Sequence, residues 1–453
     1  TAYLLYCQFC VVCIVTLKYL KLCENKHCEC RLSDNNVFGE IIDCAYFPIV
    51  LENNYTIPNT VYHLDLSNNN ISSVKSSNLL VSQSLNTLIL SRNRISKIWP
   101  ESLQLPNLKR LDLSDNQLRH IDNETFKYMK NLDSLNLAKN LFKSFSQLSF
   151  HHLSGLSEVI LDYNDLGASL EDKNMFDRSG YGLTSKIKYL SISGINLNVV
   201  KDNFFVDAYD IRKLVISRNN ITAIFELPFT LEYLDLSDNP ITEIFGEDLS
   251  DLPGLKQLKL NNLLISEVPD FAFASLRSIV SLELERNKNL TQFSELAFGQ
   301  DVLEDADDFS LEVLSLRGSR LRTLSEKFEI PFGQLRRLDL QGNFWNCDCN
   351  LKWIKELRFD LDYEHLRCYT PKPLYNSKIV ELNERYFSCP VNKHHVGAMI
   401  GVISLCLLLT VVAVWLFVCV PRAHSQSQYL KNVYTPSVGY TMLPINAYME
   451  DRT

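Results

Sequence analysis

Apolar residues recur along most of this chain in one fixed pattern. The segments that show it best are LKRLDLSDNQL (108–118), LDSLNLAKNLF (132–142), LEYLDLSDNPI (231–241) and LRRLDLQGNFW (335–345), which share L-x-x-L-x-L-x-x-N-x-L. Twelve units follow it, starting at Val61, Leu85, Leu108, Leu132, Leu156, Ile187, Ile211, Leu231, Leu255, Ile279, Leu311 and Leu335. Most starts lie 23 or 24 residues apart, the shortest spacing is 20, and two spacings are 31 and 32. Repeats of this length predict a solenoid.

Each position of the pattern has a physical interpretation. Because side chains alternate along a strand, L-x-L predicts a short strand with leucines inward and x residues outward. An asparagine both donates and accepts, so it can satisfy backbone groups where the chain turns after the strand. We expect such a ladder at Asn69, Asn93, Asn116, Asn140, Asn164, Asn219, Asn239, Asn287 and Asn343, weakened where Ile195, Leu263 and Ser319 replace it. Bulky apolar residues eighteen positions after each start predict a second core row: Leu79, Leu103, Phe126, Phe150, Phe205, Leu249 and Phe273.

The pattern resembles the leucine-rich repeat of extracellular proteins, over residues 23 to 389. Proteins of this kind include Toll-like receptor ectodomains, Slit, the Nogo receptor, platelet glycoprotein Ib and neuronal adhesion proteins. The resemblance implies an α/β solenoid, a horseshoe with a parallel β-sheet on its concave face. The 33 residues after residue 420 are too few for a Toll-type signalling domain.

Two cysteine quartets flank the repeats, Cys23, Cys28, Cys30, Cys44 and Cys347, Cys349, Cys368, Cys389. Even-numbered clusters behind a secretory signal predict disulfides; zinc is the alternative, but neither quartet has paired C-x-x-C motifs or ligand histidines. A solenoid exposes apolar core at both ends, so each quartet is expected to tie a cap. The resemblance to capped extracellular repeats implies the pairs Cys23–Cys30, Cys28–Cys44, Cys347–Cys368 and Cys349–Cys389.

The ends of the chain carry the signals for secretion and anchoring. Residues 3–17 resemble the apolar part of a signal peptide, with an uncleaved anchor as the alternative. Since the chain begins with Thr, we expect the extreme N-terminus to be incomplete. Residues 396–420 hold 25 residues without a charge, which at about 1.5 Å per residue reach across a bilayer. Five N-x-S/T sequons precede this run, at Asn54, Asn70, Asn123, Asn220 and Asn289.

The expected organisation follows from these signals. It comprises a signal peptide (1–22), an N-terminal cysteine cap (23–60), twelve repeats (61–345), a C-terminal cap (346–390), a juxtamembrane linker (391–395), a transmembrane helix (396–420) and a cytoplasmic tail (421–453). We expect a single-pass type I plasma-membrane protein with an extracellular, glycosylated N-terminal part.

The concave face is the usual recognition surface of a solenoid. Its central x column reads Asp65, Ile89, Asp112, Asn136, Ile160, Ser191, Val215, Asp235, Lys259, Glu283, Ser315, Asp339. Around units five to eight we expect a ligand-binding patch of Tyr163, Tyr189, Lys213, Val215 and Tyr233, because binding hot spots are rich in aromatic side chains. The alternative is that these tyrosines only pack across neighbouring strands.

The remaining candidate chemistry is sparse. Residues 167–186 have the composition of a projecting loop, and residues 299–310 gather Asp301, Glu304, Asp305, Asp307 and Asp308, for which a solvated acidic loop is favoured over a calcium site. No catalytic motif, cofactor motif or metal motif is present, so we expect no enzyme and no cofactor. With 45 Lys and Arg against 53 Asp and Glu, a net charge of −8 disfavours nucleic-acid binding.

The tail contains Tyr429, Tyr434, Tyr440 and Tyr448, and Tyr440 begins a Y-x-x-apolar trafficking pattern. Phosphorylation of any of the four would create an anionic docking site. The sequence thus predicts a cell-surface receptor or adhesion protein that binds a protein ligand, either a different protein or a second copy of itself. The alternative is an accessory subunit that modulates a channel or a larger receptor complex.

Overall fold

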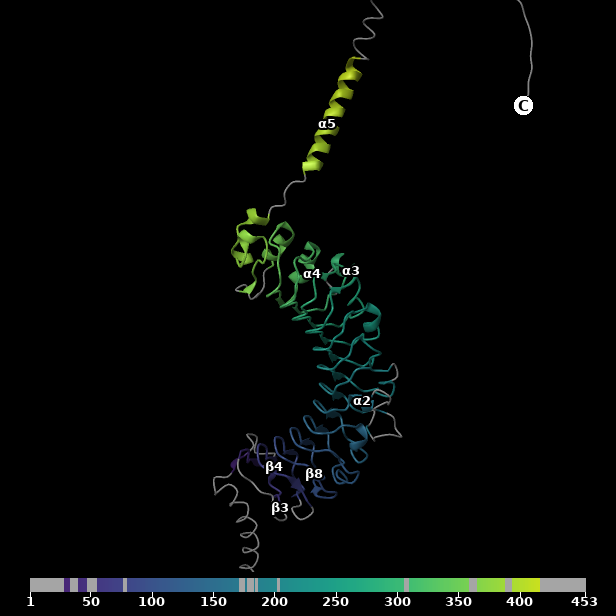
Figure 1. Ribbon diagram of the computed structural model, residues 1–453, viewed down its shortest axis with the longest axis vertical. Coiled ribbons are helices and arrows are strands. Elements are labelled where there is room, and N and C mark those ends of the chain that lie inside the picture. Colours follow the sequence, from purple (N-terminus) through teal and green to yellow (C-terminus); the bar gives the residue numbers. More distant parts are fainter. Residues whose placement is uncertain are drawn as a thin grey trace, which may run out of the picture. The chain divides into compact units, whose positions relative to one another are not determined.

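The computed structural model describes residues 28–32, 40–46, 55–75, 80–170, 176, 183, 186–201, 204–304, 309–357, 365–387 and 393–415. The chain divides into two compact units, Thr1–Ser388 and Cys389–Thr453. The first unit is a curved solenoid with its strands along the inner margin of the curve (Figure 1). The signal-peptide region, Cys23, Asn54, Leu79, Cys389 and the tail tyrosines lie outside the described residues.

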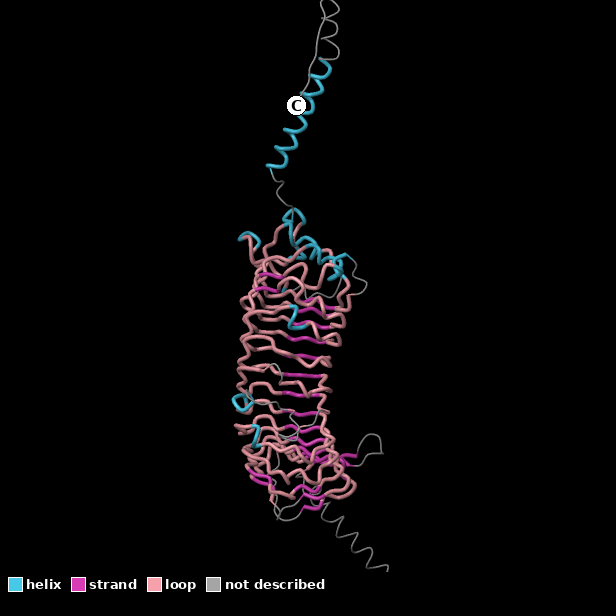
Figure 2. The backbone as a smooth tube through the Cα atoms, turned by 90° about the vertical axis from the view of Figure 1, so that its right-hand side faces the viewer, coloured by secondary structure: helices cyan, strands magenta, loops and turns pink. Residues whose placement is uncertain are grey.

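Each of the twelve sequence units contributes one strand to a continuous parallel sheet, stacked one above the next (Figure 2). Neighbouring strands pair in register, so that equivalent residues of successive units face each other. In chain order the strands are β4 (Val61–Asp65), β7 (Thr87–Ile89), β10 (Arg110–Asp112), β11 (Ser134–Asn136), β12 (Glu158–Ile160), β13 (Tyr189–Ser191), β14 (Lys213–Val215), β15 (Tyr233–Asp235), β16 (Gln257–Lys259), β18 (Ser281–Glu283), β20 (Val313–Ser315) and β21 (Arg337–Asp339).

The leucines of the pattern build the core. Leu88, Leu111 and Leu135 occupy the central inward position of their strands and are almost completely buried. The second core row is also present, with Phe126, Phe150 and Phe273 buried behind the sheet. Burying such side chains contributes roughly 1.5–3 kcal/mol each, which is why a sequence of repeated leucines folds into stacked turns.

The asparagine ladder is confirmed. Asn116, for example, donates through Nδ2 to the carbonyl oxygens of Leu90 and Leu113 at 2.9 and 3.1 Å, and its Oδ1 accepts from the Ile95 N–H at 2.9 Å. One amide therefore ties two successive turns together. At unit eleven the substitute Ser319 retains only a 3.5 Å contact to the Leu284 carbonyl oxygen.

The outer side of the solenoid differs from the expected α/β arrangement. Among the described residues its α-helices are short, α2 (Gly167–Leu170), α3 (Asp301–Glu304) and α4 (Glu329–Gly333). The other regular elements there are 3-10 turns η2 (Phe145–Gln147), η3 (Gly246–Leu249) and η4 (Glu326–Phe328), and two-residue strands β3 (Tyr55–Thr56), β5 (Ser73–Val74), β6 (Leu80–Val81), β8 (Lys97–Ile98), β9 (Leu103–Gln104), β17 (Glu267–Val268) and β19 (Gln292–Phe293). Units of 23 or 24 residues leave too little chain for a longer helix after the strand and its turns.

The expected projecting loop at 167–186 packs against the solenoid at several positions. It begins with α2, and Leu170, Phe176 and Leu183 are buried in the core. The Phe176 ring lies 6.3 Å from that of Phe205, centroid to centroid. The extra residues of this long unit therefore contribute apolar side chains to the solenoid, which the Gly, Ser and Asp content of the segment did not reveal.

Disulfide-tied segments close both ends of the sheet. At the N-terminal end, β1 (Glu29–Leu32) pairs antiparallel with β2 (Glu40–Asp43), β2 pairs parallel with β4, and Cys28 is bonded to Cys44. At the other end Cys347 is bonded to Cys368, and the segment contains η5 (Cys349–Lys355), η7 (Lys372–Leu374), η8 (Ile379–Glu381) and η9 (Glu384–Phe387). Both pairs agree with those implied by the resemblance. Cys30 and Cys349 are also disulfide-bonded, and their expected partners lie outside the described residues.

The second unit contains helix α5 (Lys393–Val414). Among the described residues, no helix has both the length and the apolar character needed to cross a membrane. The expected transmembrane helix, residues 396–420, overlaps α5, and its last residues, 416–420, lie outside the described part.

Candidate ligand-binding site

The inner face of units six to eight carries a row of three side chains, Tyr189, Lys213 and Tyr233. They occupy equivalent positions on β13, β14 and β15, so the parallel register places them directly beside one another. The Lys213 ammonium lies 4.5 Å from the centroid of the Tyr189 ring and 4.9 Å from that of Tyr233. The Lys213 ammonium therefore lies between two aromatic rings and makes a cation–π contact with each. The arrangement arises because a lysine stands between two tyrosines at the same position of three consecutive units.

The two tyrosines are half-buried, whereas Lys213 is exposed. Burial raises the pKa of both phenols above the ordinary value for tyrosine, and for Tyr233 the nearby carboxylates of Asp235 and Glu283 act in the same direction. Both hydroxyls therefore stay protonated at neutral pH and remain able to donate. The row offers a ligand one positive charge, two hydroxyl groups and aromatic surface.

A carboxylate lies next to this row. Asp162, which follows β12, accepts from the Ser191 hydroxyl at 2.7 Å and from the Ser193 N–H at 2.8 Å. Burial raises the pKa of the Asp162 carboxyl, while the two hydrogen bonds oppose that shift. Asp162 therefore serves mainly to join unit five to unit six under the aromatic row.

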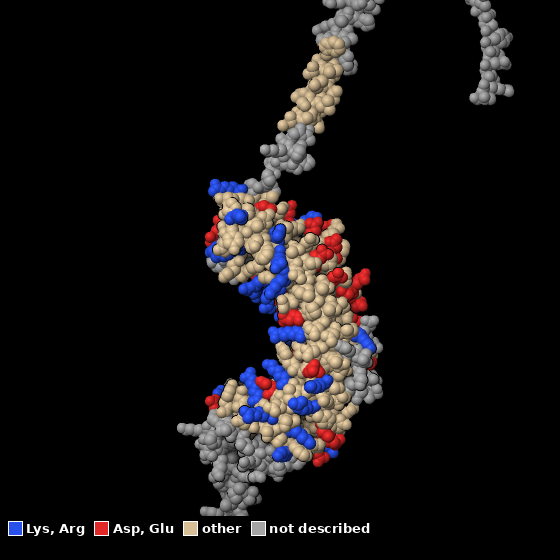
Figure 3. All heavy atoms as spheres, viewed as in Figure 1, with Lys and Arg blue, Asp and Glu red and all other residues tan. Residues whose placement is uncertain are grey.

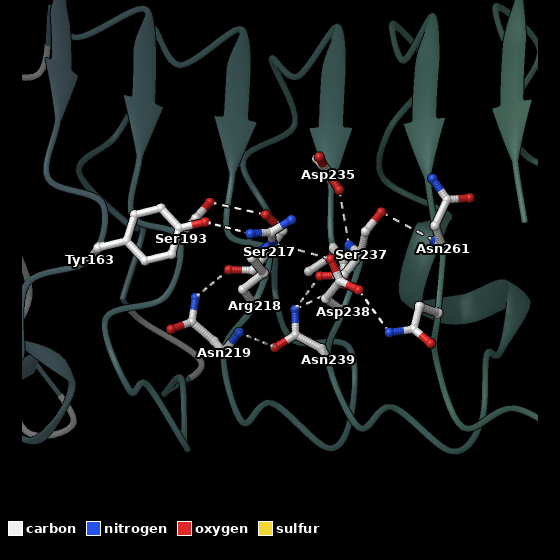
Figure 4. Close-up of polar contacts among 12 residues, drawn as sticks. Tyr163, Ser193, Ser217, Arg218, Asn219, Asp235, Ser237, Asp238, Asn239 and Asn261 are labelled. Carbon is white, nitrogen blue, oxygen red and sulfur yellow. Dashed lines mark hydrogen bonds and ion pairs between the residues drawn. The ribbon is translucent and has the colours of Figure 1, made fainter. Parts of the chain in front are cut away.

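Tyr163 does not join the row, contrary to the expected five-residue patch. It has a positive φ of 56° in the turn after β12, and its hydroxyl accepts from Arg218 Nη1 at 2.7 Å (Figure 4). The ring passes over Gly194, where an added Cβ would lie 2.8 Å from Tyr163 Cδ1. Only glycine leaves room for this crossing, which explains how a side chain of unit five reaches unit seven.

Tyr163 begins a polar chain along the edge of the sheet. Arg218 also pairs with Asp238 at 3.3 Å, and Asp238 accepts from the side-chain amide of Asn262 at 2.7 Å (Figure 4). These residues all occupy the position immediately before the ladder asparagine or its substitute, where φ is positive. The sequence pattern did not single out Arg218 and Asp238 as candidate site residues. The signal that could have identified them is their shared position in the repeat, directly before a ladder asparagine.

The central x column is less exposed than expected. Ser191, Ser315 and Asp339 are buried, and the apolar members Ile89, Ile160 and Val215 are half-buried. Several acidic members have a structural role, as in Asp112 and Asp235, which accept from the N–H groups of Ser114 and Ser237 at 2.8 and 2.9 Å. Val215 lies two residues beyond Lys213 on the same face of β14, so it extends the row with apolar surface.

The described sequon asparagines are all exposed, which leaves them available for glycosylation: Asn70, Asn123, Asn220 and Asn289. None is a strand residue of the inner face. Glycans at these positions would leave the Tyr189–Lys213–Tyr233 row uncovered.

The acidic segment 299–310 divides between described and undescribed residues. Asp301 pairs with Arg277 at 2.5 Å, which lowers the pKa of its carboxyl, and Glu304 ends α3. Asp305, Asp307 and Asp308 lie outside the described residues. Elsewhere in the described part of the chain, no group of three His, Cys, Asp or Glu side chains is placed to hold a metal ion.

Residues 106–166 and 211–263 match the Leucine rich repeat family. The stacked parallel strands of the first unit are the fold that such repeats form. The chain is 28% identical over 302 residues to Tsukushi of Gallus gallus, which covers 63% of this chain and 77% of Tsukushi. It is 27% identical over 320 residues to Toll-like receptor 7 of Mus musculus (64% of this chain, 28% of the receptor) and 25% identical over 301 residues to Transforming growth factor beta activator LRRC33 of Danio rerio (65% and 39%).

The chain therefore spans well under half of the two larger relatives. Among solved structures, a chain of the octameric complex of Latrophilin 3, Unc5D and FLRT2, the last present as its leucine-rich repeat, matches with a TM-score of 0.51 and 20% identity. The match covers 80% of this chain and 99% of that chain, and at this identity it shows the fold alone.

Proposed function

We propose that this protein is a single-pass cell-surface receptor or adhesion protein that binds a protein ligand on its concave face. The row Tyr189–Lys213–Tyr233, extended by Val215, is the centre of the contact. The observation that carries this proposal is the position of the Lys213 ammonium between two half-buried tyrosine rings on an open face. Tyrosine and cationic side chains with restricted motion lose little entropy on binding and are typical of interaction hot spots.

The remainder of the inner face supports a polar ligand surface. In units nine to twelve, Lys259 pairs with Glu283 at 3.0 Å and Arg317 lies 3.9 Å from Asp339. In the space-filling view, Lys and Arg side chains gather along much of the inner margin of the solenoid (Figure 3). A ligand with acidic groups would find complementary charge there.

Membrane anchoring is the second part of the proposal. Residues 396–420 hold no charged side chain, and the apolar side chains between Met399 and Val414 of α5 are exposed. Such a surface is unfavourable in water and favours lipid surroundings. Disulfides and exposed sequons favour an extracellular position for the first unit. Alkaline washing of membranes from cells that express the full chain should leave the protein in the pellet, and its release would contradict an anchor.

The ligand-binding proposal is tested with the full chain displayed on cultured cells and screened against a library of cell-surface ectodomains that includes its own. For any ligand found, Lys213→Ala should weaken binding by at least about tenfold, equal to roughly 1.4 kcal/mol. Tyr189→Ala combined with Tyr233→Ala should weaken it further, with surface amounts unchanged.

The matched control is Lys188→Ala, which removes another exposed lysine, one residue before Tyr189. It should leave binding unchanged. A ligand that binds Lys213→Ala and the double tyrosine variant as tightly as the unmodified protein would exclude this row as the contact.

A further inference from the structure

The outer side of the solenoid has one irregular place, at the shortest repeat. Unit seven starts at Ile211 and unit eight at Leu231, a spacing of 20 residues where most units have 23 or 24. In the units starting at Leu108, Leu132, Ile187 and Leu255, the residue eighteen positions after the start is a buried phenylalanine. In unit seven that position is Phe229, whose side chain is 62% exposed. Counted back from the next start, Phe225 takes the place of those buried phenylalanines, six residues before Leu231, and it is only partly buried.

A groove of about 810 Å³ lies beside Phe225, between the outer segments of units six, seven and eight. Phe225 takes only part of the space and stacks on Phe205, with ring centroids 6.0 Å apart. Ile224 and Leu227, which line the groove, are the least covered members of the core at 9% exposure each. A volume of this size accommodates several large side chains, far more than an ion.

Exposed apolar side chains surround the opening. Val206, Tyr209 and Phe229 all line the groove and are each at least half exposed. Tyr209 is fixed by a hydrogen bond of 3.2 Å from its hydroxyl to Asp207. Contiguous apolar surface of this kind on an extracellular protein marks a place where another molecule is bound.

The charged side chains that line the groove are all acidic: Glu226, Glu247, Asp248 and Asp251. Asp248 accepts from the backbone N–H of Phe245, whereas Glu226, Glu247 and Asp251 make no ion pair with any described residue. Figure 3 shows that Asp and Glu gather on parts of the outer margin, in contrast to the basic inner margin. Unpaired carboxylates around an apolar floor favour a ligand that carries positive charge beside apolar groups.

We propose that this groove docks a segment of a partner protein in which lysines or arginines flank large apolar side chains. The apolar side chains fill the space that the short repeat leaves open, and the cations meet the carboxylates at its rim. A second copy of this chain fits less well, because a symmetric contact would place two acidic rims against each other. The groove lies on the outer side of the sheet, so its ligand does not compete with one bound at the concave row.

The test uses the full chain in lipid nanodiscs, so that no free detergent enters the groove. The probes are three fluorescent peptides with identical apolar residues, separated by lysines, glutamines or glutamates, and binding is followed by fluorescence anisotropy. The lysine peptide should bind at least about tenfold tighter than the glutamine peptide, and the difference should shrink at high salt. The glutamate peptide should bind most weakly.

Two sets of variants separate the apolar and the charged parts of the groove. Phe229→Ser with Tyr209→Ser should weaken the lysine and glutamine peptides alike, because both lose the same apolar contact. Glu226→Gln with Asp251→Asn should reduce the preference for lysine, because two of the four carboxylates are neutralised, and leave binding of the glutamine peptide unchanged. Phe245→Ser is the control, since Phe245 is 54% exposed in the next unit but does not line the groove.

Several outcomes would overturn the proposal. These are the absence of binding by every peptide, equal binding of the lysine and glutamate peptides, or binding that survives Phe229→Ser with Tyr209→Ser. Self-association of the full chain that Phe229→Ser abolishes would instead assign the groove to a second copy. Loss of peptide binding in Tyr189→Ala would place the contact on the concave row, so failure here is distinguishable from failure of the concave site.

Discussion

At the scale of single residues, the asparagine ladder shows how one side-chain amide forms hydrogen bonds with several backbone groups. Asn116 bonds to the Leu90, Leu113 and Ser114 carbonyl oxygens and to the Ile95 N–H, all within 3.1 Å. Without it, the buried Ile95 N–H loses its partner, whereas the Leu90 and Leu113 carbonyl oxygens keep the bonds that Asn93 and Asn140 donate. A group left unsatisfied in this way costs about 1–3 kcal/mol.

Asn116→Ala should therefore destabilise the solenoid by about 1–3 kcal/mol, because the buried Ile95 N–H loses its partner. Thermal unfolding followed by circular dichroism would measure the effect. The control is Asn107→Ala, which removes an exposed amide that bonds only to the Gln83 carbonyl oxygen. Equal melting temperatures for the two variants would contradict the ladder's contribution.

Asp162 predicts a pH-dependent effect. Because burial raises the pKa of its carboxyl in the folded state, ionisation penalises folding above the ordinary Asp pKa of about 3.9. Asp162→Asn, which still accepts from Ser193, should stabilise the protein at neutral pH. That gain should fall to nothing as the pH drops below about 4, where the carboxyl is protonated in both states. Melting temperatures of both proteins across this range would show it, and a gain that grows toward low pH would contradict it.

The sequence predicted the ladder because the same residue recurs at a fixed spacing. It predicted less well which side chains of the inner face are exposed, because their exposure depends on the size of the side chains on adjacent strands. Ser191, for example, sits in register between Ile160 and Val215, whose larger side chains cover it. Tyr163 illustrates the same difficulty, since its path toward Arg218 depends on the missing side chain of Gly194.

At the scale of elements, the C-terminal cap shows how the end of the sheet is sealed. Trp345 is completely buried and its indole N–H donates to the Leu340 carbonyl oxygen at 2.9 Å. Trp353 packs against Phe332 of α4, with ring centroids 6.2 Å apart. The Cys347–Cys368 bond joins residues that are 21 positions apart in the sequence and closes a loop around this apolar contact.

Cys347→Ser should lower stability by about 3 kcal/mol and reduce the amount of protein that reaches the cell surface. Surface biotinylation and the melting temperature of purified protein would measure the two effects. Cys406→Ser provides the control, because Cys406 is an exposed free cysteine in α5. Normal display and melting of Cys347→Ser would count against the sealing role of this disulfide.

At the scale of the solenoid, the number of turns and their order follow from the spacing of unit starts, and the structure places one strand after each. The groove at unit seven was also encoded in a spacing, that of 20 residues. Its character was not predictable from that number alone. It depends on the partial burial of Phe225 and the exposure of Phe229, which are properties of packing between units.

The interruptions of the ladder at Ile195, Leu263 and Ser319 have a mechanical consequence. Each turn of a solenoid touches only the turns beside it, so a load applied along its length passes through every turn in series. A protein that holds another cell or a matrix fibre is loaded in this way. Stretching should then begin at the interrupted turns, which would yield first and absorb extension before the disulfide-tied ends are reached.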